Sequence, residues 1–451
     1  MNWPQLLSSK RFGDKKELDS NASARSRFEQ DYDRVVFSHP FRRLQDKTQV
    51  FPLPEDDFVH TRLTHSLEVS SVGRSLGRMV GEQLINKYPE LNVSGFTSHD
   101  FGGIVAAACL AHDLGNPPFG HSGETAISSF FIDNPKGRNF RDRVLEEEWT
   151  DLTNFEGNAQ GFRILNDEAN SGLKLTFATL GAFTKYPKTS GSPKLEDRKS
   201  QKKYGVYRSE LSLFEDMAGE MDLRVLGQEA WCRHPLTFLV EAADDICYNI
   251  IDLEDGCRLG LVPYETTRDL MAAIIGKRYD QEKLERSNDK NQKIGLLRAM
   301  AIHQLIIECV NLFLEKEEDI LNGEFDSALT DYIPSGDVLN SITKLSVKEI
   351  YRSKQVLERE AGGFEVIGKL MESFCLAVYS KSFDSEQFTP RLQSIYSLIP
   401  ETHLEKLKKP DMSVYETLMV VTDFISSLTD SHAIKIYKTI YGFSLPSSKG
   451  F

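Results

Sequence analysis

The most constraining segment of the chain is an apolar stretch that ends in two polar residues. Residues 104–111 read Ile-Val-Ala-Ala-Ala-Cys-Leu-Ala, and His112 and Asp113 follow directly. Gly115 and Pro117 then predict the end of a helix, because glycine favours helix C-termini and proline cannot continue a helix. A helix this apolar is expected to be buried, and buried polar side chains need partners. A divalent metal is a natural partner for an imidazole beside a carboxylate, with a buried His-Asp hydrogen bond as the alternative.

Helical periodicity dominates the rest of the sequence, and strand-like alternation is scarce, so we expect an all-α fold. One further helix is expected to begin at Pro235, since proline suits the first helical position. The other expected helices or long amphipathic stretches cover residues 61–84, 97–114, 121–131, 158–166, 174–185, 293–314, 356–379 and 415–441.

Two stretches are expected to be loops, and one polar stretch suggests a boundary. Residues 133–151 are highly charged, and residues 187–205 are basic and rich in Ser, Gly and Pro. The composition turns polar near residues 278–292. We therefore expect a core that carries the chemistry over residues 1–277. A helical C-terminal region over residues 278–451 would pack, assemble or regulate.

The composition of the 451 residues narrows the class of protein. The net charge of −13 argues against a whole-surface binder of nucleic acid or anionic membranes, but it is compatible with a local basic pocket for phosphate. None of the six cysteines forms a Cys-x-x-Cys pair, which argues against a zinc knuckle or a disulfide framework. The first residues lack the apolar core of a signal peptide, and no run of about 18 apolar residues occurs. We expect a cytoplasmic protein without a membrane span.

Further metal ligands are expected from two other helices. His65 lies upstream, with Arg62 one turn before it on the same face, where its planar fork suits a phosphate oxygen. Downstream, Asp244, Tyr248 and Asp252 recur every four residues and form one stripe. Asp244 is the expected ligand because it shares that face, and Asp245, which points about 100° away on an ideal helix, is the close competitor. Two imidazoles and two carboxylates suit Mn, Fe, Zn or Mg, and the residue types do not decide among them.

His121 and Glu124 follow the His-Asp pair after a rigid Asn-Pro-Pro turn. Side chains three apart on a helix can touch, and an imidazole held by a carboxylate is a tuned acid or base. An ordinary surface pair is the alternative for this element taken alone.

Several stretches together resemble the HD-domain superfamily and, more specifically, the dGTPase-like deoxynucleoside triphosphate triphosphohydrolase family. They span roughly residues 20–260, and their order along the chain is more specific than any one of them. The matching stretches are Ser26-Arg-Phe-Glu-Gln-Asp-Tyr-Asp33-Arg34, Phe41-Arg-Arg-Leu-Gln-Asp-Lys-Thr-Gln49-Val-Phe-Pro-Leu, Thr61-Arg62-Leu-Thr-His65-Ser-Leu-Glu-Val, His112-Asp113-Leu-Gly-Asn-Pro-Pro-Phe-Gly-His121-Ser-Gly-Glu124, Asn154-Phe-Glu-Gly-Asn158-Ala-Gln160-Gly and Glu241-Ala-Ala-Asp244-Asp-Ile.

The resemblance implies a role for each candidate residue. It implies a helical HD-domain core with a helical C-terminal extension, and a metal held by His65, His112, Asp113 and Asp244. His121 and Glu124 would be catalytic. Gln49, Tyr248 and Asp252 would line the deoxyribose, and the triphosphate would meet Arg62, Lys185, Tyr186 and Lys203. For Lys185 and Lys203, in or beside the basic loop, a solvated charge run is the competing interpretation.

The resemblance also implies an activity and partners. The expected reaction is hydrolysis of a dNTP, with dGTP favoured, to deoxynucleoside and inorganic triphosphate. Family members are typically homo-oligomers, often hexamers, and some respond to nucleotides or single-stranded DNA. The acidic composition of this chain gives no independent support for DNA binding. The alternatives are another HD phosphohydrolase, such as a 5′-nucleotidase or cyclic-nucleotide phosphodiesterase, and a nucleotide-binding regulator without catalysis.

Overall fold

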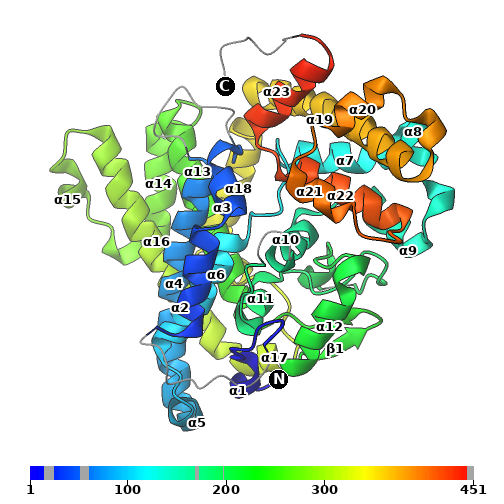
Figure 1. Ribbon diagram of the computed structural model, residues 1–451. Helices are drawn as coiled ribbons and strands as arrows, with labels where there is room; N and C mark the ends of the chain where they lie inside the picture. Colours follow the sequence, from blue (N-terminus) through cyan, green and yellow to red (C-terminus); the bar gives the residue numbers. More distant parts are fainter. Residues whose placement is uncertain (15–24, 51–59, 168–171, 197, 444–451) are drawn as a thin grey trace.

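The computed structural model describes residues 1–14, 25–50, 60–167, 172–196 and 198–443 (Figure 1). The expectation of an all-α fold is confirmed. Within these residues the only strands are β1 (Val225–Gly227) and β2 (Ala230–Trp231), which form one short antiparallel pair.

The helices differ widely in length. In the first half of the chain they are α1 (Trp3–Leu6), α2 (Arg27–Val36), α3 (His39–Arg43), α4 (Arg62–Lys87), α5 (Pro89–Val93), α6 (Ser98–Ala111), α7 (His121–Asp133), α8 (Pro135–Arg138), α9 (Glu146–Thr153), α10 (Gly157–Asn166), α11 (Phe177–Phe183) and α12 (Leu211–Glu220). In the second half they are α13 (Thr237–Arg258), α14 (Tyr264–Ile275), α15 (Gln281–Glu285), α16 (Lys290–Glu315), α17 (Glu317–Leu321), α18 (Gly336–Glu349), α19 (Lys354–Phe383), α20 (Pro390–Tyr396), α21 (Glu401–Lys406), α22 (Val414–Ser427) and α23 (Asp430–Ile440).

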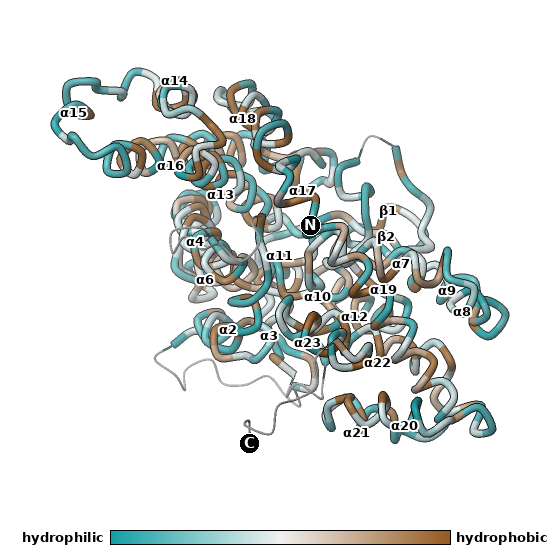
Figure 2. The backbone as a smooth tube through the Cα atoms, turned by 90° about the horizontal axis from the view of Figure 1, so that it is seen from above, coloured by the Kyte–Doolittle hydropathy of each residue, from teal (hydrophilic) through white to brown (hydrophobic). Residues whose placement is uncertain are grey.

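Two hydrophobic clusters organise these helices. In Figure 1 the long helices α4, α6, α13 and α16 lie together on one side, and α7, α19 and α22 lie on the other. The first cluster contains Val69 of α4 and Phe313 of α16, and the second contains Phe131 of α7 and Phe374 of α19. Apolar burial is the main stabilising contribution in such clusters. Both clusters combine residues from before and after residue 277, so the boundary expected there stays a prediction. Figure 2 shows hydrophobic residues along the inner faces of the long helices.

Glycines allow α4 and α6 to approach closely, and this packing fixes the first candidate histidines. A Cβ atom on Gly77 would lie 2.7 Å from the carbonyl oxygen of Phe101, and one on Gly73 would lie 2.5 Å from Sγ of Cys109. Small residues at such positions let two helix backbones pack at short range. The N-terminal end of α4 is thereby brought beside the C-terminal end of α6.

Three details differ from the sequence-based expectations. Residues 133–151 contain α8 and α9, because Asn134 caps the first and Glu148 bonds back to the backbone of Leu145 at the start of the second. The stretch 415–441 is two helices, because Thr429 caps α23 and so ends continuity with α22. The helix expected over 174–185 is shorter, since Thr176 caps its start and it ends at Phe183.

In the described part of the chain, one helix, α16, is long and apolar enough to cross a membrane by length and composition alone. It packs on α4, α13 and α14, and Leu305, Cys309 and Phe313 on it are fully buried. The core helix of a water-soluble protein has the same properties.

Candidate active site

Three helices bring two histidines and two aspartates together. His65 lies in the first turn of α4, His112 and Asp113 follow the last residue of α6, and Asp244 lies in α13. Ligand atoms of His65, His112 and Asp113 all lie within 4.8 Å of one another. Oδ1 of Asp244 lies 3.2 Å from Nε2 of His65 and 3.6 Å from Nε2 of His112. Three of the four residues expected to hold a metal therefore lie within reach of one ion, and the fourth, Asp244, lies beside both histidines.

The neighbours of these residues orient them for a cation. Nδ1 of His112 lies 2.6 Å from the carbonyl oxygen of Cys109 and donates to it, which leaves Nε2 facing the aspartates. Oδ1 of Asp113 accepts a hydrogen bond of 2.5 Å from Asn116, and Oδ2 accepts one of 2.7 Å from Arg62. Two imidazole nitrogens and two carboxylates, held in this way, fit a divalent metal.

The electrostatics of the cluster favour positive charge at its centre. Burial opposes ionisation of Asp244, but His112 and His65 outweigh it and lower the pKa of Asp244 far below its usual range. Burial likewise opposes protonation of His65, but its hydrogen bond to Asp244 outweighs that and raises the pKa of His65. A site that draws a proton in this way also attracts a metal cation, which competes with protons for the same atoms.

The two adjacent aspartates of α13 face different partners. Asp244 faces the histidines, whereas Oδ2 of Asp245 accepts a hydrogen bond of 2.6 Å from Thr330. Burial raises the pKa of Asp245 to about 6. Of the two residues that the sequence left in competition, Asp244 is the one beside His65.

His121 and Glu124 form a hydrogen-bonded pair at the start of α7. Nδ1 of His121 lies 3.1 Å from Oε2 of Glu124. The other carboxylate oxygen accepts a hydrogen bond of 2.8 Å from the backbone N–H of Gly157. The histidine side chain is 82 % exposed and the glutamate 12 %. The hydrogen bond to Glu124 raises the pKa of His121. An accessible imidazole is thus held by an anchored carboxylate.

Tyr248 and Asp252 lie one turn apart on α13, next to Tyr351. Oδ2 of Asp252 accepts a hydrogen bond of 2.6 Å from the Tyr351 hydroxyl, and the rings of Tyr248 and Tyr351 stack at 5.5 Å between centroids. Burial raises the pKa of Asp252 to about 7 and that of Tyr248 to about 12. Flat rings beside a carboxyl group suit a sugar with hydroxyl groups.

Two lysines expected near a triphosphate, Lys185 and Lys203, each form an ion pair with a glutamate. Nζ of Lys185 lies 3.4 Å from Glu241, one turn before Asp244, and 6.0 Å from the ring centre of Tyr186. Lys203 lies 2.9 Å from Glu156. In both lysines burial lowers the pKa, but the nearby glutamate outweighs it and the pKa is raised.

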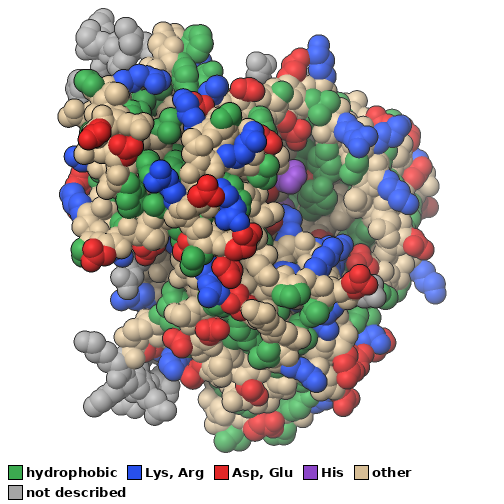
Figure 3. All heavy atoms as spheres, turned by 90° about the vertical axis from the view of Figure 1, so that its right-hand side faces the viewer, with side chains coloured by type: hydrophobic (Ala, Val, Ile, Leu, Met, Phe, Trp, Pro, Cys, Tyr) green, Lys and Arg blue, Asp and Glu red, His purple; other side chains and the backbone are tan. Residues whose placement is uncertain are grey.

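Two candidate side chains keep polar atoms without a partner. Within the described residues, Nε of Arg62 and Oε1 of Gln49 are buried without a hydrogen bond. Such atoms lose free energy unless a ligand or water satisfies them. Figure 3 shows a hollowed face of the molecule with a histidine and several Lys and Arg side chains beside the hollow.

A separate cavity of about 250 Å³ lies between α3, α10, α21 and α22. Its lining includes Arg43, Lys47, Arg163 and Lys406, and none of the four clustered residues lines it. It is therefore distinct from the candidate metal centre.

The chain is similar to known proteins along nearly its whole length. The family described as HD domain matches residues 62–150. A deoxyguanosinetriphosphate triphosphohydrolase-like protein of Synechocystis is 42% identical over 99% of this chain and all of that protein. A protein of the same description from Pseudomonas aeruginosa is 38% identical over 99% of this chain and all of its own length. The deoxyguanosinetriphosphate triphosphohydrolase of Yersinia enterocolitica is 30% identical over 92% of this chain and 93% of its own.

The chain belongs to the deoxyguanosinetriphosphate triphosphohydrolase-like family. Its HD domain contains the His65 and His112-Asp113 elements and the His121–Glu124 pair, and HD hydrolases are metal-dependent. Asp244 and Tyr351 lie outside that match.

Sequence reasoning missed Tyr351 in this member of the triphosphohydrolase-like family. Tyr351 follows α18, 99 residues after Asp252, in a region without a recognised motif. Its neighbours in the sequence, Arg-Ser-Lys on one side and Lys-Glu-Ile on the other, give no local sign of a site. Only the packing of α18 against α13 reveals it.

Proposed function

We propose that this protein hydrolyses deoxynucleoside triphosphates, dGTP foremost, to the deoxynucleoside and inorganic triphosphate. The observation that carries the proposal is the convergence of His65, His112, Asp113 and Asp244 from three helices. We further propose that these four residues hold one divalent ion: Mn, Mg, Fe or Zn.

In the proposed reaction a water molecule gives one proton to the solvent and its oxygen forms a bond to the α-phosphorus. The bond from that phosphorus to the 5′-oxygen breaks, which releases inorganic triphosphate. A bound divalent ion lowers the pKa of water and withdraws charge from phosphate oxygens. The leaving 5′-alkoxide needs a proton, and His121 supplies it from Nε2. Glu124 holds Nδ1 of that imidazole, so the proton to be transferred lies on the exposed nitrogen. In-line displacement then requires His121 and the water on opposite sides of the phosphorus.

The remaining residues bind the two ends of the substrate. Arg62, whose Nε has no protein partner, binds a phosphate oxygen, and Lys185, Tyr186 and Lys203 bind further along the triphosphate. Tyr248, with Asp252 and Gln49, binds the deoxyribose and leaves no room for a 2′-hydroxyl. We therefore expect ribonucleotides to react poorly.

One experiment tests the proposal and its rivals. Each dNTP and, in parallel, a deoxynucleoside monophosphate and a cyclic nucleotide are incubated with the protein and Mn²⁺ or Mg²⁺, and the products are separated by anion exchange. Release of triphosphate supports the proposal. A 5′-nucleotidase releases inorganic phosphate from a monophosphate, and a cyclic-nucleotide phosphodiesterase gives a linear monophosphate. A regulator without catalysis leaves every nucleotide intact.

Three further proposals concern the protein in the cell: its location follows from the composition, and the other two follow from the family resemblance. It is cytoplasmic, it assembles as a homo-oligomer such as a hexamer, and a nucleotide or single-stranded DNA changes its activity. Sedimentation and turnover with and without these effectors test the last two.

A further inference from the structure

Asp430, the first residue of α23, is a buried carboxylate that joins three other segments of the chain. Its side chain is 1 % exposed. Oδ2 accepts hydrogen bonds from the backbone nitrogen and from Oγ1 of Thr48, at 3.1 and 2.8 Å. Oδ1 accepts a hydrogen bond of 2.9 Å from the backbone nitrogen of Phe119. Arg359 of α19 forms an ion pair with Oδ2 of Asp430. A buried charge needs this many partners to be tolerated.

The first segment that Asp430 holds is the turn leading into the candidate acid. Phe119 and Gly120 have φ of 62° and 58°, and His121 begins α7 directly after them. A left-handed conformation is unfavourable for phenylalanine and persists only where its surroundings fix it. A Cβ on Gly120 would lie 2.9 Å from Nη2 of Arg62, so the turn passes close to the candidate phosphate-binding residue.

The second segment contains a candidate sugar residue. Thr48, with both its backbone and its hydroxyl bound to Asp430, directly precedes Gln49. One carboxylate is therefore bonded to the residue before Gln49 and to the turn before His121.

The start of α19 covers the same turn. The guanidinium of Arg359 lies 5.7 Å from the ring centre of Phe119, and a Cβ on Gly363 would lie 2.5 Å from Cγ of that ring. Ser122, next to His121, donates a hydrogen bond of 2.6 Å to the carbonyl oxygen of Glu360. The C-terminal region thus fixes the start of α7 by hydrogen bonds and by packing.

We propose that Asp430 is a positioning residue, which sets the location of His121 and of the Gln49 segment relative to each other. This inference rests on the proposed function for its kinetic test. It assigns to the C-terminal region a part in completing the active site, in addition to packing.

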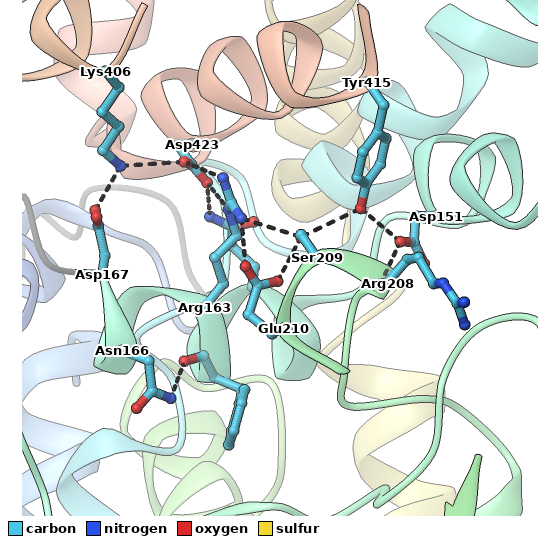
Figure 4. A network of polar contacts seen from close by, with 12 residues as sticks. Asp151, Arg163, Asn166, Asp167, Arg208, Ser209, Glu210, Lys406, Tyr415 and Asp423 are labelled. Atoms are coloured by element: carbon cyan, nitrogen blue, oxygen red, sulfur yellow. Dashed lines mark hydrogen bonds and ion pairs between the residues drawn. The ribbon is translucent and has the colours of Figure 1, made fainter. Parts of the chain in front are cut away.

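Hydrogen exchange provides a test that does not depend on activity. In Asp430→Asn, amide exchange is expected to increase about tenfold or more over residues 117–124 and 44–50, because one oxygen acceptor is lost and the ion pair is removed. Asp423→Asn is the matched control. Asp423 is a buried carboxylate seven residues earlier, bound to Arg163 and Lys406 in a network that contains neither segment (Figure 4). Protection over 117–124 that is equal in both variants and the wild type overturns the inference.

Kinetics separate positioning from a merely structural role. Asp430→Asn is expected to lower kcat about 10- to 100-fold, because small displacements of a catalytic group have effects of this size. Asp423→Asn is expected to lower Tm but leave kcat within about twofold of wild type. Thr48→Val, which deletes only the hydroxyl bond, is expected to raise KM for dGTP about threefold with kcat retained.

The double variant is the decisive comparison. If Asp430 acts through His121, then His121→Ala with Asp430→Asn has a kcat within about twofold of His121→Ala alone. A double variant that shows the product of the two single effects overturns the inference. Failure of the proposed function is recognised separately, because the wild type then releases no triphosphate while the exchange experiment still gives its result.

Discussion

The hydroxyl of Tyr351 donates a hydrogen bond of 2.6 Å to Oδ2 of Asp252, and its ring stacks on Tyr248. This contact connects the segment after α18 to the stripe of α13 that is proposed to bind deoxyribose. A sugar hydroxyl that approaches Asp252 therefore meets a carboxyl group whose second oxygen is already held in place.

The variant Tyr351→Phe tests the contribution of this hydrogen bond. It keeps the stacked ring and removes the donor, so Asp252 loses its anchor. Because a hydrogen bond to a carboxylate contributes about 1.5–3 kcal/mol, kcat/KM for dGTP is expected to fall about tenfold or more. Tyr332→Phe is the control, because Tyr332 is 63 % exposed. Equal kcat/KM in both variants would show that Tyr351 has no role in substrate binding.

The metal proposal makes opposite predictions for two neighbouring residues. After removal of metal with EDTA, Asp244→Asn is expected to bind Mn²⁺ at least about tenfold more weakly than wild type, because it loses a ligand beside His65 and His112. Asp245→Asn is expected to bind Mn²⁺ like wild type, since Asp245 faces Thr330. Calorimetric titration measures both. The reverse ranking would move the ligand to Asp245.

The sequence was most informative where the chemistry follows the local pattern of a single helix. The apolar run before His112 predicted a buried helix, and helical spacing placed Asp244 on one stripe with Tyr248 and Asp252. These are local relationships, which periodicity records directly. The sequence did not predict the close approach of α4 to α6, which brings His65 beside His112. That approach depends on glycines that face another helix.

Contacts over long sequence separations had no local signal. Asp430 meets Thr48 across 382 residues, and Tyr351 meets Asp252 across 99. The loops expected over 133–151 and the single stretch expected over 415–441 failed for a different reason. Asn134 caps a helix in a stretch that its charge suggested was a loop. Thr429 caps a new helix in a stretch that its periodicity suggested was continuous.

The pairing of His121 with Glu124 predicts the direction of a pH effect. The general acid must carry its proton, so kcat is expected to fall as the pH rises through the pKa of His121. The hydrogen bond from His121 to Glu124 raises that pKa, so Glu124→Gln is expected to move this fall to lower pH. The glutamine can still accept the hydrogen bond from Gly157.

Profiles of kcat against pH with saturating dGTP measure this shift. Glu90→Gln, an exposed change on α5 beyond the far end of α4, is the control and should keep the wild-type profile. A profile of Glu124→Gln that shifts to higher pH would contradict the proposed role of the pair.

Stability at low pH is expected to depend on His234, which is fully buried away from the candidate site. Its Nε2 donates a hydrogen bond of 2.9 Å to the carbonyl oxygen of Leu6, and its Nδ1 accepts one of 3.1 Å from the backbone nitrogen of Leu236. Since one ring nitrogen donates and the other accepts, the ring is neutral. Burial lowers the pKa of His234 to about 4. Because a histidine in the unfolded chain has a pKa near 6.5, protons bind mainly to the unfolded state as the pH falls from 6.5 toward 4. The neutral His234 therefore contributes to the stability of the folded state above pH 6.5, and this contribution is lost as the pH falls toward 4.

The loss amounts to about 3 kcal/mol between pH 6.5 and 4. His234→Gln supplies one donor and one acceptor but does not titrate, so its apparent Tm is expected to fall less than that of wild type between pH 7 and pH 4.5. Carboxylates elsewhere contribute equally to both proteins, and the difference between the two slopes therefore isolates the imidazole. His99→Gln, at an exposed position, should keep the wild-type slope. Parallel slopes for His234→Gln and wild type would mean that His234 does not resist protonation in the folded state.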